Sequence, residues 1–228
     1  MAKAGRRSTT KGRFDAASTR QKLVEAAFQI LSQDGFTHAS ARTIATRAGS
    51  NPALVFYYFD SVNDLLVAAL AHSSRTQRDR YQRALADVTS LLELVTAVES
   101  ELREDFDTGH VKVLAELVAA SAHDEELRDA VLAEVDPWLR FTEDAVDRVL
   151  RANGLEGAIP SSQVAFLLVS LFLGMEQLGS LVSYEREASL FADLFGSARN
   201  LAGLVTGWTT TPTRPPPPSV LGDGDGAW

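Results

Sequence analysis

Residues 37–66 constrain the fold most, because they place two short helices around a tight turn and lead into a third helix. Ser40 is a favourable N-cap for a helix whose spacing puts small apolar residues on one face: Ala41, Ile44, Ala45 and Ala48. Gly49 ends that helix, because glycine tolerates the left-handed conformation common at helix C-termini. Asn51 and Pro52 then supply an N-cap and a first-turn proline for the next helix. This is the layout of a helix-turn-helix DNA-binding unit.

The second helix of this motif is predicted to span residues 52–59, and its spacing is interpreted as placing Val55, Phe56 and Phe59 inward. The other positions then face a partner: Ala53, Leu54, Tyr57 and Tyr58. Small residues at the front of the helix allow its backbone to enter a major groove. The alternative is a purely structural three-helix unit that does not bind DNA.

The run from Ala48 to Ser61, AGSNPALVFYYFDS, preceded by Ile44-Ala45 and followed by Leu65-Leu66, resembles the N-terminal signature of TetR-family transcriptional regulators. The resemblance covers roughly residues 20–70. Two positions depart from the family pattern: Val62 stands where a phosphate-contacting lysine is usual, and Phe56 where a tyrosine is usual. The expected DNA-contacting residues are Ser40, Arg42, Thr43, Asn51, Pro52, Ala53, Leu54, Tyr57 and Tyr58.

Arg42 is expected to read a base edge, because arginine bound bidentately to guanine is the commonest specific contact and the family places a base-contacting residue there. The hydroxyls of Tyr57 and Tyr58 are expected to hold phosphates. Ala53 and Leu54 are expected to approach base edges or thymine methyl groups.

The charge distribution supports a DNA-binding front on an acidic body. The net charge is −8, but residues 1–72 hold nine Lys/Arg against five Asp/Glu, which leaves thirteen against twenty-five for the remainder. Such a split attracts phosphate to one end and repels it from the rest. A merely basic tail on an acidic protein is the alternative.

The sequence predicts an all-α fold with a three-helix helix-turn-helix unit (residues 18–71) and a helical effector-binding and dimerisation body (residues 72–208). A disordered basic arm (residues 1–17) and a disordered Pro/Gly-rich tail (residues 209–228) flank them. The first helix is expected to begin at Thr19 and end at Gly35. The body's helices are expected at 62–82, 81–103, 111–122, 127–153 with a kink at Pro137, 161 to about 182, and 185 to about 205.

The helix beginning at Ser161 is apolar nearly all round, so it must be covered on two faces. A second copy of the chain is the simplest cover, because reading a palindrome needs a twofold partner. The expected dimer interface is formed by this helix and the next, residues 185 to about 205, and it contains Leu168, Phe172 and Met175. A monomer's central core helix is the alternative.

No catalytic or metal-binding pattern stands out. The four histidines lack an i, i+4 partner, and the sequence has no cysteine, phosphate loop or G-x-S-x-G motif, so we expect no enzyme activity, metal or cofactor. The apolar run Val164–Met175 is too short to cross a bilayer, and residues 1–15 lack a secretory signal's apolar core. These features favour a cytoplasmic protein. A helical ligand carrier or adaptor without DNA binding, and an unrecognised all-α enzyme, remain the alternatives.

The resemblance also implies an effector pocket in the body. Its candidate residues are polar or aromatic side chains among apolar neighbours: His110, Glu116, Trp138, Phe141, Glu176 and Gln177. For any one of them, an ordinary helix-to-helix hydrogen bond or exposure to solvent is the competing interpretation. The ligand is expected to be a largely apolar small molecule that weakens operator binding.

Overall fold

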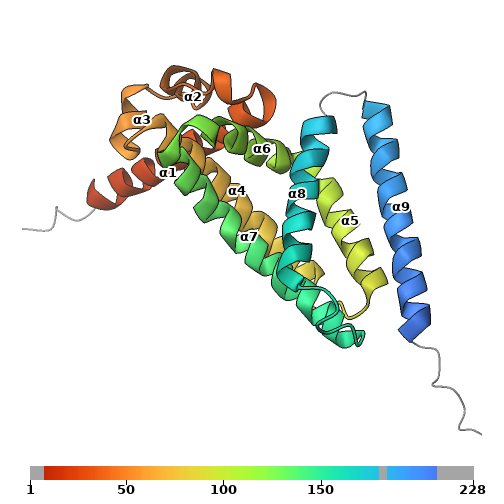
Figure 1. The fold of residues 1–228 in the computed structure, drawn as a ribbon. Helices are drawn as coiled ribbons and strands as arrows, with labels where there is room; N and C mark the ends of the chain where they lie inside the picture. Colours follow the sequence, from red (N-terminus) through yellow and green to blue (C-terminus); the bar gives the residue numbers. More distant parts are fainter. Residues whose placement is uncertain (1–7, 180–183, 210–228) are drawn as a thin grey trace, which may run out of the picture.

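The computed structural model describes residues 8–179 and 184–209, and every regular element within these ranges is a helix (Figure 1). The N-terminal part comprises α1 (Ser8–Gln33), a 3-10 turn (Phe36–His38), α2 (Ala41–Arg47) and α3 (Ala53–Tyr58). The body comprises α4 (Val62–Ala84), α5 (Leu91–Thr108), α6 (His110–Ala120), a second 3-10 turn (Ser121–His123), α7 (Glu125–Ala152), α8 (Ser161–Gly179) and α9 (Tyr184–Thr209). The predicted all-α fold is confirmed.

One apolar core joins the N-terminal unit to the body. It contains buried residues of α1 to α4, among them Leu31, Ile44 and Leu66, together with Val113 and Leu117 of α6. The predicted boundary at residue 71 lies inside α4, which is continuous from Val62 to Ala84. The two parts therefore share a helix and a core. A displacement of α4 or α6 changes the packing in both parts, because the core is close-packed.

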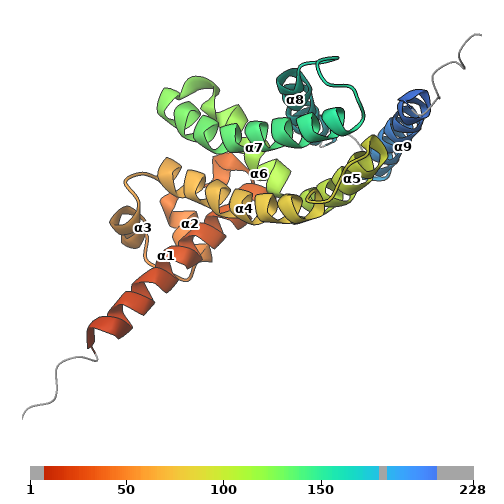
Figure 2. The same ribbon diagram turned by 90° about the horizontal axis from the view of Figure 1, so that it is seen from below.

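The N-terminal unit and α9 lie at opposite ends of the molecule (Figures 1 and 2). Between them, α4 packs against α1, α6 and α7, while α8 packs on α6 and α7. The last helix, α9, packs on α5. One side of both α8 and α9 is consequently left without cover from the described part of the chain.

The predicted helix over residues 81–103 is wrong, because α4 ends at Ala84 and α5 begins at Leu91. Ser90 and Glu93 form a capping box: Ser90 Oγ accepts a hydrogen bond from the N–H of Glu93, and Glu93 Oε2 accepts one from the N–H of Ser90. This S-x-x-E pattern was readable in the sequence as a helix start. The helix then continues beyond residue 103, its predicted end, to Thr108.

The start of α1 also differs from the prediction. The helix begins at Ser8 and not at Thr19, so most of the expected disordered arm is helical backbone. Residues 1–7 of that arm and residues 210–228 of the expected tail lie outside the described residues. Pro137 lies inside α7, which continues on both sides of it.

Candidate functional site

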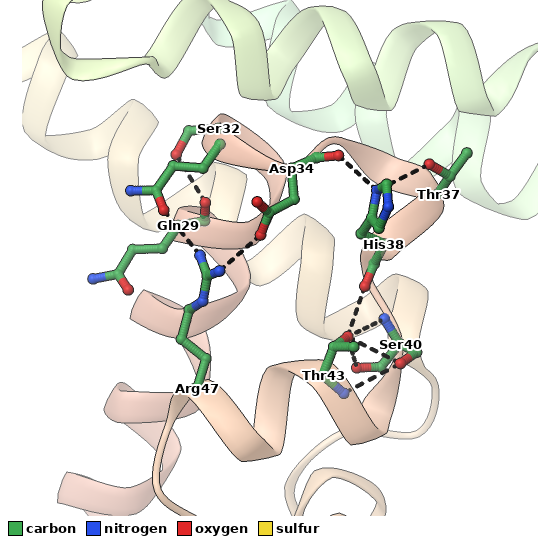
Figure 3. Close-up of polar contacts among 9 residues, drawn as sticks. Gln29, Ser32, Asp34, Thr37, His38, Ser40, Thr43 and Arg47 are labelled. Atoms are coloured by element: carbon green, nitrogen blue, oxygen red, sulfur yellow. Dashed lines mark hydrogen bonds and ion pairs between the residues drawn. The ribbon is translucent and has the colours of Figure 1, made fainter.

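Local capping bonds fix how α2 meets α3. Ser40 Oγ accepts a hydrogen bond from the N–H of Thr43, whose own hydroxyl accepts one from the N–H of Ser40 (Figure 3). The helix ends before Gly49, which has a φ of +61°. Asn51 Oδ1 then accepts a 2.9 Å hydrogen bond from the N–H of Ala53. The capping roles inferred from the sequence for Ser40 and Gly49 are confirmed. The N-cap position of α3 is Pro52 and not Asn51, although Asn51 accepts the hydrogen bond from the first helical residue.

A polar frame holds the end of α2 against the end of α1 and the start of α2 against the 3-10 turn (Figure 3). The Arg47 guanidinium donates to Asp34 at 2.7 Å and to Gln33 at 3.0 Å. The Thr43 hydroxyl donates to the carbonyl of His38 at 2.6 Å. Arg47 and Thr43 are thus engaged in building the unit, whereas Arg42 lies on the exposed side of α2.

The outward face of α3 differs from the one inferred from the sequence. Phe56 is 61% exposed and Tyr57 74% exposed, whereas Leu54 and Tyr58 are half-buried. Val55, Tyr58 and Phe59 face the core, which is the i, i+3, i+4 spacing of a helix. Phe56 was assigned inward from its spacing together with Val55 and Phe59, and that assignment is wrong. The helical spacing, counted strictly from Val55, was the signal that would have placed it outside.

The exposed face of the motif thus consists of Arg42 on α2 with Pro52, Ala53, Phe56 and Tyr57 on or before α3. The side chain of Val62, where the family usually has lysine, packs partly against the core. This face presents one guanidinium, one phenol hydroxyl and an exposed apolar ring, groups that contact base edges, phosphates and thymine methyls respectively.

A second feature is an apolar cavity in the body. It lies between α4, α5, α6, α7 and α8 and has a volume of about 90 Å³. Three of the residues predicted to line a pocket do line it: His110, Trp138 and Phe141. Leu168 and Phe172, which were predicted at a dimer interface, line it as well.

The aromatic wall of the cavity consists of Tyr81, Trp138 and Phe141, which meet edge to face. Their ring centroids are 5.4 Å apart for Tyr81 and Trp138 and 6.2 Å apart for Trp138 and Phe141. Edge-to-face contact is a favourable arrangement of aromatic rings and holds them in fixed orientations. The wall therefore consists of apolar ring surface.

The ionisable groups beside the cavity already pair with other residues of the protein. Arg80 forms ion pairs with Glu101, with Glu104 at 2.8 Å, and with Asp105. Burial raises the pKa of Asp105, and hydrogen bonding to Tyr81 and the charge of Arg80 partly offset that rise. His110, only 4% exposed, lies 2.9 Å from the Ser73 hydroxyl through its Nδ1. Burial, with a smaller effect of Arg80, lowers the pKa of His110 to about 4, so this imidazole is neutral at pH 7.

Two other pocket candidates lie elsewhere. Glu116 accepts a 2.8 Å hydrogen bond from the N–H of Phe36 in the N-terminal unit and does not line the cavity. Gln177 borders a shallow second pocket between α6 and α8. The Glu176 side chain lies outside the described residues.

The uncovered side of α8 and α9 carries large apolar residues at matching spacing. Leu167, Leu171 and Leu178 on α8 are exposed, as are Leu190, Leu194, Leu201 and Leu204 on α9. The predicted interface residues point elsewhere, since Phe172 and Met175 pack against the cluster of Leu102, Phe191 and Phe195. By length and composition alone α8 could cross a membrane, contrary to the inference from its apolar run, although core helices of soluble proteins also pass that test.

Together, the capped two-helix motif, the polar frame and the exposed face of α3 define a helix-turn-helix protein. Residues 23–69 match the model of the family described as bacterial regulatory proteins, tetR family. The helix-turn-helix unit of this chain is therefore a TetR-family unit.

An uncharacterized HTH-type transcriptional regulator of Mycobacterium tuberculosis is 26% identical over 110 residues, which is 48% of this chain and 56% of that protein. The chain thus spans about half the length of the curated relatives it matches. A TetR-family regulator structure from Rhodococcus sp. superposes with a TM-score of 0.65 at 21% identity, covering 81% of this chain and 98% of the other. The structure of FadR of Bacillus subtilis in complex with stearoyl-CoA superposes with a TM-score of 0.63 at 15% identity. The match covers 80% of this chain and 96% of FadR. At these identities the structural likeness shows the fold.

Proposed function

We propose that the protein is a ligand-responsive transcriptional regulator that binds a palindromic DNA operator as a homodimer and is released by a small molecule. The exposed face of α3, held in place by the Ser40 cap and the Asn51 hydrogen bond, carries this proposal. The TetR-family match supports a regulator and not an enzyme or an adaptor. A regulator of this kind acts in the cytoplasm, beside the chromosome.

Two features support the homodimer. The exposed leucines of α8 and α9 form an apolar surface that a second copy would cover. A helix-turn-helix unit reads one half-site, so two units about 34–36 Å apart are needed to read a palindrome in successive major grooves. We further propose the repressor mode, with the effector stabilising a different separation of the two units.

Helix α6 supports the coupling between cavity and DNA. His110, Val111 and Leu114 of this helix line the cavity, while Val113 and Leu117 lie in the core shared with the N-terminal unit. A ligand that shifts α6 therefore acts on both. Helix α4 offers a second route for this coupling, because it contributes Tyr81 to the cavity wall and Leu66 and Leu70 to the core shared with the N-terminal unit.

The test is fluorescence anisotropy with DNA from upstream of the protein's own gene and with shuffled DNA of the same composition, at several salt concentrations. Specific binding is expected to exceed non-specific binding by at least about a thousandfold. Equal affinity for both DNAs would overturn the proposal of an operator-binding regulator.

A further inference from the structure

Arg20 on α1 holds its guanidinium beside the end of α3, and it was not among the residues that the sequence assigned to DNA. The Cζ atom of Arg20 lies over the Phe59 ring, 4.8 Å from the ring centroid. Phe59 is the C-terminal cap of α3 and belongs to the buried core, so its ring is a fixed support. The Arg20 side chain itself is exposed. A positive charge is therefore held at one end of the helix proposed to enter the major groove.

The hydrogen-bonding groups of this guanidinium remain available to a partner. Stacking on an aromatic ring uses the flat face of a guanidinium, whereas its N–H donors lie in the plane and point outward. None of the ion pairs among the described residues includes Arg20. By contrast, Arg47 at the end of α2 is paired with Asp34. A fixed, exposed fork of donors that is not ion-paired matches the geometry of a phosphate group.

The junction between α3 and α4 lacks a cation of its own. Val62, the first residue of α4, stands where the TetR resemblance places a phosphate-contacting lysine, and its side chain packs partly against the core. Phe59 precedes Val62 by only three positions, so Arg20 brings a positive charge to this junction from α1. The start of α1 and α3 lie at the same end of the molecule (Figure 2).

We propose that Arg20 binds a phosphate of the DNA backbone at the end of α3 and supplies the contact that Val62 cannot make. This inference rests on the proposed DNA-binding function and adds a residue to its binding surface. The contact neutralises one phosphate and reads no base. It therefore contributes equally to the binding of operator and of unrelated DNA.

The salt dependence of DNA binding counts contacts of this kind. Fluorescence anisotropy gives the affinity of the full-length protein for upstream DNA and for shuffled DNA at a series of salt concentrations. Arg20→Gln is expected to weaken binding to both DNAs by a similar factor, on the order of tenfold at low salt. It is also expected to reduce the slope of log affinity against log salt concentration by about 0.9, the value for one phosphate.

Lys22→Gln is the matched control, because it removes the same charge from the same helix. Two successive positions apart in an α-helix means a rotation of about 200°, so the exposed Lys22 lies on a different side of α1 from Arg20. This variant is expected to leave the slope unchanged. Arg20→Lys retains the charge and is expected to keep the slope as well. Circular dichroism verifies that each variant is folded.

Four outcomes would overturn this inference: an unchanged slope in Arg20→Gln, an equal fall of the slope in Lys22→Gln, a reduced slope in Arg20→Lys, or a loss of affinity confined to the upstream DNA. The last result would make Arg20 a base contact. Equal affinity of the wild type for both DNAs would refute the operator-binding regulator and leave the slope test of Arg20 intact. Specific binding by the wild type with an unchanged slope in Arg20→Gln would refute the phosphate contact alone.

Discussion

The Glu116 carboxylate on α6 accepts a 2.8 Å hydrogen bond from the backbone N–H of Phe36, eighty positions earlier in the chain. The approach is close, since a Cβ added at Gly35 would lie 3.3 Å from Glu116 Oε2. One helix thus holds the turn between α1 and α2 through Glu116 and borders the cavity through His110. This bond is a direct physical link from the cavity-lining helix to the DNA-binding motif.

Glu116→Ala is expected to weaken the coupling between cavity and operator. The Phe36 N–H would lose its acceptor, which costs about 1–2 kcal/mol of unfolding free energy. Operator affinity measured with and without a saturating small molecule that raises the protein's melting temperature gives the coupling. Glu116→Gln retains an acceptor oxygen and is the control. This variant is expected to keep most of the coupling. Undiminished coupling in Glu116→Ala would show that the link runs through other contacts, such as those of α4.

Arg42→Ala is expected to cost about 1–3 kcal/mol of binding free energy on the operator and far less on shuffled DNA, if Arg42 reads a base edge. Arg47→Ala is the control, because Arg47 is held by Asp34 at 2.7 Å and its loss should lower stability more than sequence discrimination. Anisotropy titrations on both DNAs separate the two effects. Equal losses on both DNAs for Arg42→Ala would make it a phosphate contact.

Tyr57→Phe is expected to weaken binding evenly across DNA sequences, because the exposed hydroxyl is proposed to hold a phosphate. Phe56→Ala removes an exposed ring without a polar group, so it is expected to change sequence preference by about 1–3 kcal/mol at one position. Titration of a set of single-base operator variants measures both. A change of preferred operator in Tyr57→Phe would contradict its assignment.

Leu167→Glu is expected to dissociate the homodimer, because it buries a charge in the proposed α8–α9 interface. Leu132→Glu, at a 50% exposed leucine of α7, is the control and should leave assembly unchanged. Sedimentation velocity at micromolar concentration reports the oligomeric state. A wild-type monomer that binds a single half-site would contradict the dimer proposal.

Stability is expected to fall as the pH drops from about 6.5 toward 4, in part through His110. Burial lowers its pKa to about 4 in the folded state, below its usual value of about 6.5, so the unfolded chain takes up the proton first. The contribution of neutral His110 to the free energy of unfolding is complete above about pH 6.5. Below that pH it falls by about 1.4 kcal/mol per pH unit. Urea unfolding of wild type at a series of pH values measures the slope.

His110→Gln is expected to flatten that slope, whereas the exposed His123→Gln is expected to leave it unchanged. The difference between the variants is the relevant quantity, because the raised pKa of Asp105 acts with the opposite sign at lower pH. An unchanged slope in His110→Gln would mean that this imidazole is not buried in its neutral form.

The sequence by itself determined the helix-turn-helix motif, because its signals are local. Ser40, Gly49, Asn51 and Pro52 act on the backbone within a few residues of themselves, and their order along the chain was enough to locate both helices. The error at Phe56 was of a different kind. Phe56 was counted on the same face as Val55, although only the residues three and four positions after Val55 share that face. An exposed apolar ring is acceptable on a face that meets a partner.

Tertiary packing alone decided the use of the remaining residues. His110, Trp138 and Phe141 were recognised as candidates, but only the meeting of five helices made one cavity of them. Glu116 was assigned to that cavity, while the structure pairs it with a backbone N–H eighty positions away. Leu168 and Phe172 were assigned to the dimer surface, but the rotation of α8 against α7 turns them inward and exposes Leu167 and Leu171. On a helix that is apolar all round, composition does not distinguish the two faces, and only the neighbours that pack against it do.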